Sequence, residues 1–236
     1  MSEKQQLNLA REIEILSEVK HDLLVNLLGV ITSDAKLQLV MDFCRGGDLF
    51  TLLHQCEEVE LSVNTQIQLL KDVAMAMTFL HGRSPKIVHR DLKSLNIMLV
   101  EPVLSDSDAV VVKVCDFGQA KKFDEDPATA CVGTQRWMAP EVLMSNDYDH
   151  KADVFSFAMV MFEVICREIP FEDLSAVKVA LHTANGGRPD MDAIPPDTRP
   201  EFVQLMIRCW AQEAEDRPEF DTIVAKLACL RIPDKE

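Results

Sequence analysis

The sequence lacks any stretch that is long and apolar enough to cross a membrane. Its longest such run, residues 154–166, is interrupted by Glu163 and falls short of the ~20 apolar residues that a bilayer requires. The first ten residues, MSEKQQLNLA, contain no apolar segment of the signal-peptide type. We therefore expect neither a membrane span nor a secretion signal in this sequence.

Paired cysteines and an excess of basic charge are also missing. The seven cysteines are odd in number and scattered without a CxxC spacing, which is typical of reduced thiols in a cytoplasmic protein. Lysine and arginine total 24 against 39 acidic residues, giving a net charge of -15. This balance argues against nonspecific nucleic-acid binding, because no broad basic surface is available for phosphates.

The apolar pattern predicts a small strand pair with one helix, followed by a larger and mostly helical body. Residues 8–19 have helical spacing, and 23–32 and 36–43 read as two strands joined by a turn. Hydrophobic residues make up 47% of the 236 residues, enough for one substantial core or two small ones. The further expected helices are 48–55, 62–82, 151–167, 174–184, 199–211 and 219–230, and the further short strands are 86–88, 97–100 and 110–115.

The first segment with chemical potential is HRDLKSLN, residues 89–96, which lies between two expected strands. Phosphoryl transfer needs a proton acceptor, cations on the phosphate oxygens and alignment of the reacting groups. Asp91 can accept the proton, Lys93 can hold the phosphate, and the Asn96 oxygen can bind a metal ion. The plain alternative is a polar surface loop.

The second segment is Asp116-Phe117-Gly118, which follows the expected strand 110–115. A carboxylate at the end of a buried strand suits Mg²⁺, which takes one or two carboxylates together with phosphate oxygens. Phe117 can fill an apolar slot. The alternative is a turn that merely ends the strand.

The third segment is GTQRWMAPE, residues 133–141. A buried acid at Glu141 would need a partner, and the DRPEF sequence supplies Arg217 far along the chain. We expect an ion pair between the two that acts as scaffold, not in catalysis.

HRDLxxxN, DFG and APE in this order resemble the protein-kinase family, and the likeness extends from about Glu12 to the C-terminus. Lys93, Ser94 and the GTQRWMAPE end resemble the tyrosine-kinase-like group of serine/threonine kinases, and the AAR or RAA typical of tyrosine kinases is absent. The resemblance implies an α+β, protein-kinase-like fold. Its mostly helical C-lobe would cover 44–236, and 1–43 would be the remnant of an N-lobe with one helix and about two strands.

The resemblance also implies roles for particular residues. Asp91 would accept the proton, with Lys93 as its catalytic neighbour, and Asn96 and Asp116 would hold Mg²⁺. In the ATP site, Met41 would be the gatekeeper, and Asp42, Phe43 and Cys44 would form the hinge. Met98 would form the floor under adenine, and Glu12 would be the helix glutamate that pairs with an ATP-anchoring lysine.

Regulatory and structural roles follow from the same resemblance. Residues 116–141 would form the activation segment, in which Thr129 is the best phosphorylation candidate and Arg90 the group that meets its phosphate. The alternative is that Thr129 is an unmodified loop residue. Leu16, His89 and Phe117 would stack as a regulatory spine, and Asp153 would brace the catalytic loop.

The sequence departs from the family where the ATP phosphates should be covered. None of its eight glycines forms GxGxxG, and no VAIK-type strand lysine precedes Glu12. A truncated form of an active kinase, a natural short form with a scaffolding role, and a chain that borrows strands from another all fit, and the intact motifs favour truncation. We predict a cytoplasmic signalling serine/threonine kinase by family, which uses ATP and Mg²⁺ on protein substrates. Dual specificity, and the activity of this chain without the glycine-rich loop and the strand lysine, are left open. The alternative is a non-catalytic interaction module.

Overall fold

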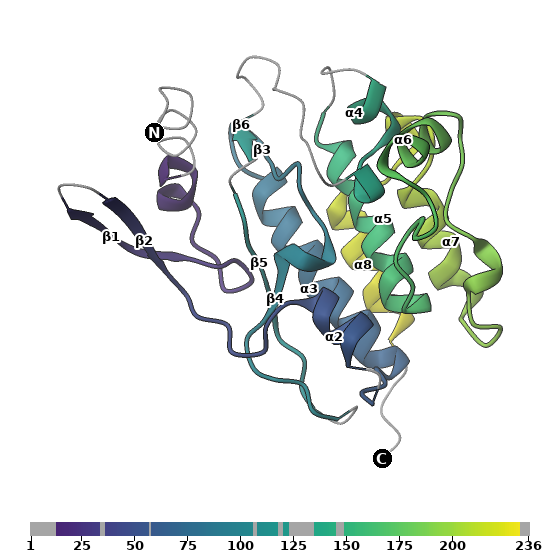
Figure 1. Cartoon of the computed structure of the whole chain (residues 1–236), viewed down its shortest axis with the longest axis horizontal. Coiled ribbons are helices and arrows are strands. Elements are labelled where there is room, and N and C mark those ends of the chain that lie inside the picture. The colour runs from purple at the N-terminus through teal and green to yellow at the C-terminus, as the bar shows by residue number, and fades with distance from the viewer. Residues whose placement is uncertain are drawn as a thin grey trace.

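A computed structural model of the chain describes residues 13–33, 36–56, 58–105, 108–117, 120–122, 135–144 and 149–231. Within these ranges a β-hairpin projects from a body that consists mainly of helices (Figure 1). The strand pair followed by a helical body is the architecture that the sequence predicts.

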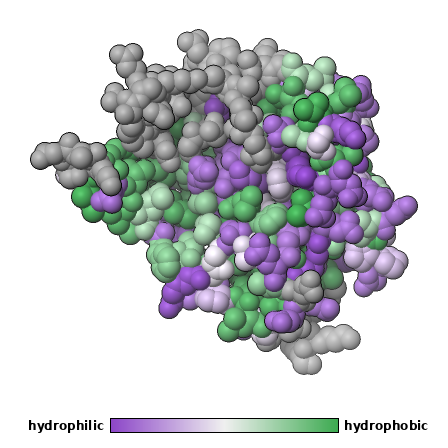
Figure 2. All heavy atoms as spheres, viewed as in Figure 1, coloured by the Kyte–Doolittle hydropathy of each residue, from purple (hydrophilic) through white to green (hydrophobic). Residues whose placement is uncertain are grey.

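The hairpin is formed by β1 (Leu27–Ser33) and β2 (Lys36–Met41), which pair antiparallel with a bulge between Leu27 and Gly29. The helical residues 13–18 precede it. Large apolar side chains remain exposed along both strands, and Figure 2 shows them as a green surface at the left of the molecule. They are Leu28, Val30, Ile31, Leu37, Val40 and Met41.

The next two helices begin where their capping residues predict. Asp48 accepts a hydrogen bond from the Thr51 amide at 2.9 Å at the start of α2 (Leu49–Gln55). Ser62 caps α3 (Val63–His81) in the same way, and Gly82 ends it. Both helix boundaries predicted from the sequence are therefore confirmed.

The centre of the body is α5 (Lys151–Cys166), in which every residue from 152 to 165 is buried. The longest helix, α3, packs most extensively against α8 (Phe220–Leu230), although the two are far apart in the sequence. The remaining helical elements are α4 (Pro140–Met144), α6 (Ala176–Ala184) and α7 (Pro200–Cys209), with 3₁₀ turns at Ser94–Asn96, Gln135–Trp137, Met191–Ala193 and Ala214–Asp216.

Two further strand pairs fix the ends of the segment 89–96. β3 (Ile87–Val88) pairs with β6 (Lys121–Lys122), and β4 (Ile97–Leu99) pairs with β5 (Val112–Val114). The segment is thus a loop held by a strand on either side, as expected. Across the described ranges, no helix has both the length and the apolarity that a membrane span requires.

Candidate active site

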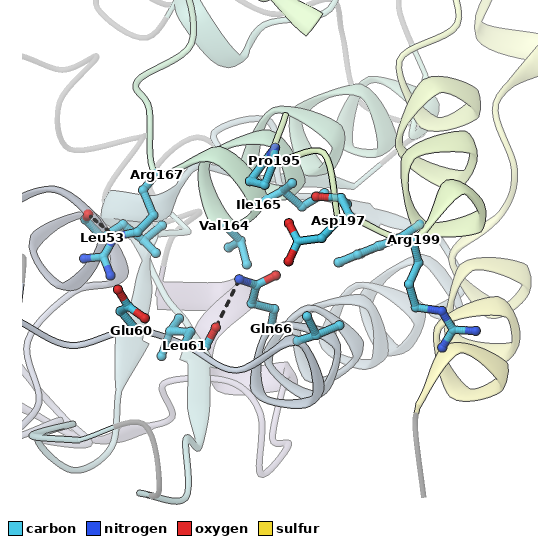
Figure 3. A pocket seen from close by; sticks show the side chains of 13 residues that line it. Leu53, Glu60, Leu61, Gln66, Val164, Ile165, Arg167, Pro195, Asp197 and Arg199 are labelled. Carbon is cyan, nitrogen blue, oxygen red and sulfur yellow. Dashed lines mark hydrogen bonds between the residues drawn. The ribbon is translucent and has the colours of Figure 1, made fainter. Parts of the chain in front are cut away.

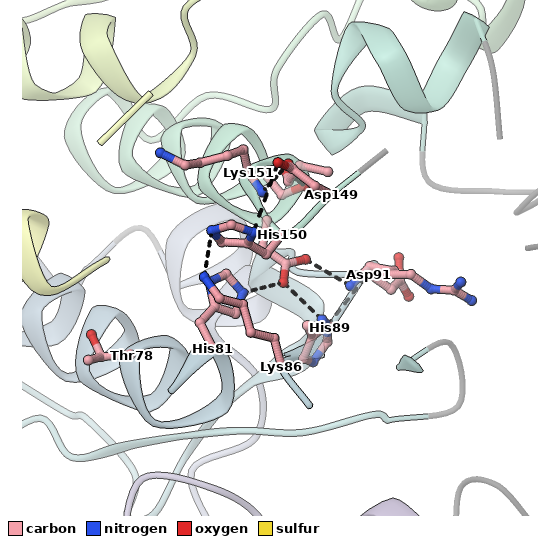
Figure 4. A network of polar contacts seen from close by, with 12 residues as sticks. Thr78, His81, Lys86, His89, Asp91, Asp149, His150 and Lys151 are labelled. Carbon is pink, nitrogen blue, oxygen red and sulfur yellow. Dashed lines mark hydrogen bonds and ion pairs between the residues drawn. The ribbon is translucent and has the colours of Figure 1, made fainter. Parts of the chain in front are cut away.

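The loop 89–96 is anchored to the central helix by one buried carboxylate. Asp153 on α5 is fully buried and accepts hydrogen bonds from the backbone amides of His89 and Arg90, each at 2.8 Å. The His81 ring lies 2.9 Å from the same carboxylate, and Figure 4 shows this network reaching from α3 through His89 to Asp91. Burial raises the pKa of Asp153, but the His81 hydrogen bond and the neighbouring donors outweigh it, so the pKa lies below its usual range.

This anchoring imposes an unusual backbone conformation on the loop. Arg90 adopts a φ of 68°, in the left-handed region that non-glycine residues rarely occupy. The hydrogen bonds from the His89 and Arg90 amides to Asp153 hold the backbone on the N-terminal side of this residue. The side chain of Asp153 therefore determines the path of the chain into Asp91.

Asp91 is buried at 8% exposure, and its immediate neighbours in the loop hold one of its oxygens. Its Oδ2 accepts hydrogen bonds from Lys93 Nζ at 2.7 Å and from Asn96 Nδ2 at 3.1 Å. Its Oδ1 is buried and has no hydrogen-bond partner in the described part of the chain. A buried carboxylate oxygen without a partner is unusual in a folded protein, and here it leaves one acceptor of Asp91 unused by the described residues.

Pairing of β4 with β5 brings the segments of Asn96 and Asp116 together. The amide of Cys115 donates to the Asn96 carbonyl at 2.9 Å, directly before Asp116. Asn96 donates through its side-chain nitrogen to the backbone carbonyl and the carboxylate of Asp91, so its side-chain oxygen is the atom that a metal ion could use. Asp116 is exposed, and its φ of 66° turns the chain away from the strand at this point.

The ring of His89 contacts both the loop that carries Asp91 and the segment 115–117. Its Nε2 lies 3.0 Å from the Cys115 carbonyl, and its Nδ1 accepts the Asp91 amide at 3.3 Å. Its ring centroid is 5.5 Å from that of Phe117, which is buried. Leu16, the third expected member of this stack, is buried in the same apolar core.

The segment expected to bind adenine is tied to β5. Asp42 accepts from Lys113 Nζ at 2.5 Å and from the side chain and backbone of Asn26. The Lys113 hydrogen bond is the main reason why the pKa of Asp42 lies below its usual range. Lys113 stands opposite Met98 in the β4–β5 pairing, so the half-buried Met98 and the segment after Met41 are attached to the same strands.

The other expected hinge residues differ in exposure. Phe43 is 84% exposed, whereas burial raises the pKa of the Cys44 thiol. The chain then closes onto β4, where Gly46 donates to the Leu99 carbonyl at 3.0 Å. A Cβ atom at Gly46 would lie 2.3 Å from the Glu101 carbonyl oxygen, so this close approach requires glycine.

The ion pair predicted between Glu141 and Arg217 is present. Two guanidinium nitrogens of Arg217 contact the carboxylate at 2.6 and 2.8 Å, and Arg217 itself is 1% exposed. Its remaining bonds go to the carbonyls of Ala211, Lys151 and Gln212. The pair joins α4 to the segment before α8 and takes no part in the hydrogen bonds of Asp91.

Two of the expected site residues, Glu12 and Thr129, lie outside the described residues. The glycine of the DFG segment, Gly118, does so as well. Arg90 is described through its backbone contacts, and its expected partner Thr129 is not.

Comparison with known sequences identifies the family. Residues 1–227 match the family described as "Protein tyrosine and serine/threonine kinase". The chain belongs to this protein kinase family. The kinase motifs that the sequence carries thus stand in a chain that matches the family over nearly its whole length.

Relatives of the chain within this family include plant and amoebal proteins. It is 36% identical over 220 residues to "Serine/threonine-protein kinase STY46" and 35% identical over 226 residues to "Serine/threonine-protein kinase VIK", both of Arabidopsis thaliana. It is 36% identical over 219 residues to "Dual specificity protein kinase shkD" of Dictyostelium discoideum. These matches cover 92%, 93% and 92% of the kinase chain but only 36%, 50% and 28% of the respective relatives.

Sequence reasoning missed several polar contacts of this kinase. Lys113, which fixes Asp42, reads as an ordinary polar position within a strand. His81, which binds Asp153, reads as the last residue of a helix. Glu163 interrupts an apolar run of the sequence, and a charged residue inside such a run is itself a signal that polar partners surround it.

Proposed function

We propose that this kinase domain transfers the γ-phosphoryl group of Mg-ATP to a serine or threonine hydroxyl of a protein. The observation that carries the proposal is Asp91, whose Oδ2 is held by Lys93 and Asn96 while its Oδ1 is buried without a partner in the described part of the chain. The 2.7 Å contact fixes Lys93 beside the acid, where it can meet a phosphate oxygen.

The donor set around Asp91 fits a magnesium ion bound to phosphate. Mg²⁺ prefers oxygen ligands and takes few of them from the protein, and the Asn96 oxygen with the exposed Asp116 carboxylate would supply two. When bound, the ion would neutralise charge on the phosphates. The adenine would lie along residues 41–44, above Met98. Glu12, which lies within the part of the sequence that matches the kinase family, would contribute to anchoring ATP.

The remaining assignments belong to the same proposal. Arg90 would receive a phosphate on Thr129 within an activation segment over 116–141, next to Phe117. Glu141, Arg217 and Asp153 would be structural. Residues 1–43 would contribute to an N-lobe and 44–236 would form the C-lobe. The proposal also includes a cytoplasmic location and a role in signalling. The six cysteines in the described ranges are free thiols, which fits a reducing compartment.

Phosphorylation of a generic protein substrate with Asp91→Asn tests the proposal. Loss of the proton acceptor is expected to lower the turnover rate by about 10²–10⁴-fold. Asp221→Asn changes an exposed carboxylate on α8 in the same way and is expected to leave turnover unchanged. Equal turnover of the Asp91→Asn variant and the unaltered protein would refute the role of Asp91.

A thermal-shift titration with Mg-ATP gives a second, independent measurement. A ligand that binds the folded state raises the unfolding temperature by mass action, and the shift is expected to require Mg²⁺ and to be reduced by Asp116→Ala. If Mg-ATP does not raise the unfolding temperature and the protein also lacks transferase activity, a non-catalytic interaction module is favoured instead.

A further inference from the structure

One buried carboxylate joins three segments that are far apart in the sequence. Glu163, near the end of α5, is 0% exposed and accepts hydrogen bonds from Ser94 Oγ at 2.6 Å and Trp137 Nε1 at 2.6 Å. His54 Nε2 lies 3.2 Å from the same carboxylate. Ser94 belongs to the loop that carries Asp91, and Trp137 to the turn that precedes α4.

The chemistry of this junction makes its geometry specific. A buried carboxylate requires hydrogen-bond donors, because an unpaired charge in the interior is costly. Ser94 and Trp137 donate to different oxygens of Glu163, so the planar carboxylate fixes the distance and direction between them. Trp137 is also held through its carbonyl, which accepts from Ser156 on α5 at 2.7 Å.

The same part of α5 also holds α2. Arg167, one turn after Glu163, donates to the carbonyls of Leu52, Leu53, Cys56 and Val59. Beside it lies a cavity of about 440 Å³ whose lining includes Leu53, Val164 and Gln66 (Figure 3). The contacts of Glu163 with His54 and of Arg167 with the carbonyls of Leu52 and Leu53 thus fix the position of α2.

We propose that Glu163 is a positioning residue that couples the segment 135–144 to the loop 89–96. It binds no reacting group itself. It orients Ser94, and with it the adjacent Lys93 that contacts Asp91 at 2.7 Å, relative to Trp137. The link to catalysis rests on the proposed function, whereas the coupling between the two segments does not.

Hydrogen–deuterium exchange of the full chain tests the coupling without any assay of activity. Ser94→Ala removes only a hydroxyl, and it is expected to raise exchange about tenfold both in its own loop and in residues 137–144. Trp137→Phe removes the indole N–H and is expected to raise exchange in residues 92–97. The double variant is expected to exceed neither single variant appreciably, because both lose the same connection.

Ser156→Ala serves as the matched control. It removes a hydroxyl that holds Trp137 without involving Glu163, so it is expected to affect 135–139 and leave 92–97 unchanged. Exchange effects of Ser94→Ala that stay within the loop 89–96 would overturn the proposal. So would strictly additive effects of the two substitutions.

Kinetics then separate this inference from the proposed function. Ser94→Ala and Trp137→Phe are expected to lower kcat about tenfold with the KM for ATP unchanged, and Ser156→Ala to leave kcat unchanged. If Asp91→Asn abolishes turnover while these variants keep full kcat, positioning is refuted and the kinase proposal stands. If the segments are coupled in exchange but Asp91→Asn changes nothing, the kinase proposal fails and the coupling stands.

Discussion

The substitution Asp153→Asn tests how the fold holds the loop 89–96. Asp153 presents two carboxylate oxygens to three donors: His81 Nε2 at 2.9 Å and the amides of His89 and Arg90 at 2.8 Å. An asparagine keeps one acceptor oxygen and turns an NH₂ group towards a remaining donor. At least one hydrogen bond to a charged group is lost, and each is worth about 1.5–3 kcal/mol.

The loss sums to about 3 kcal/mol, because one buried donor is also left unpaired. A chain of this size loses about 2–4 °C in unfolding temperature for each kcal/mol, so Tm is expected to fall by about 6–12 °C. Calorimetry and urea unfolding at pH 7 measure the two quantities. Hydrogen exchange around Arg90 should rise as well, because its left-handed backbone loses its support.

The lowered pKa of Asp153 determines how its contribution to stability changes with pH. The pKa of Asp153 is lowered in the folded protein, so its stabilisation is present above the unfolded pKa of about 3.9 and is lost as the pH falls through the lower folded value. The stability difference between the unaltered protein and the variant should therefore shrink in acid.

Asp72→Asn is the matched control for this substitution. Burial raises the pKa of Asp72, and its hydrogen bond from Gln68 at 2.7 Å can be kept by the asparagine oxygen, so no loss of stability is expected at pH 7. A change in Tm below 1 °C for Asp153→Asn, or an equal loss for Asp72→Asn, would show that the bracing argument is wrong.

Three other outcomes are expected. Arg217→Met should lower the free energy of unfolding by about 3–5 kcal/mol in urea melts, and Arg217→Lys should not restore it, since a single ammonium cannot replace the two-pronged contact with Glu141; a loss below 1 kcal/mol would contradict this. Gly46→Ala should destabilise the chain and weaken any Mg-ATP thermal shift, because the added Cβ would lie 2.3 Å from a backbone oxygen, whereas Gly29→Ala, with open space around it, should do neither. In a thiol titration near pH 8, the exposed Cys229 should react with Ellman's reagent before unfolding, while the buried Cys209, whose pKa burial raises to about 12, should react only afterwards; early reaction of Cys209 would refute this assignment.

Features with local causes could be predicted from the sequence. Ser62 and Gly82 bound α3 through contacts within a few residues, and the alternation of short apolar runs with polar loops marks β4 and β5. The Glu141–Arg217 pair could also be predicted, because a buried acid needs a cation and the DRPEF sequence supplies one.

Contacts that depend on the tertiary fold could not be predicted in the same way. No local pattern indicates that Glu163 meets both Ser94 and Trp137, since the three residues are separated by long stretches of chain. No propensity scale predicts the left-handed backbone at Arg90 either, because a hydrogen bond from its amide to the distant carboxylate of Asp153 supports it. The motifs identified which residues carry chemistry, and the fold determines what holds them.

The packing of α3 against α8 has a consequence for how the protein is made. The ribosome releases α3, and with it the loop that carries Asp91, long before it has synthesised α8. Until then the apolar side chains of α3 lack part of the packing that covers them in the finished fold. A nascent chain stalled before residue 220 should therefore be a chaperone client, and release of α8 should end that dependence.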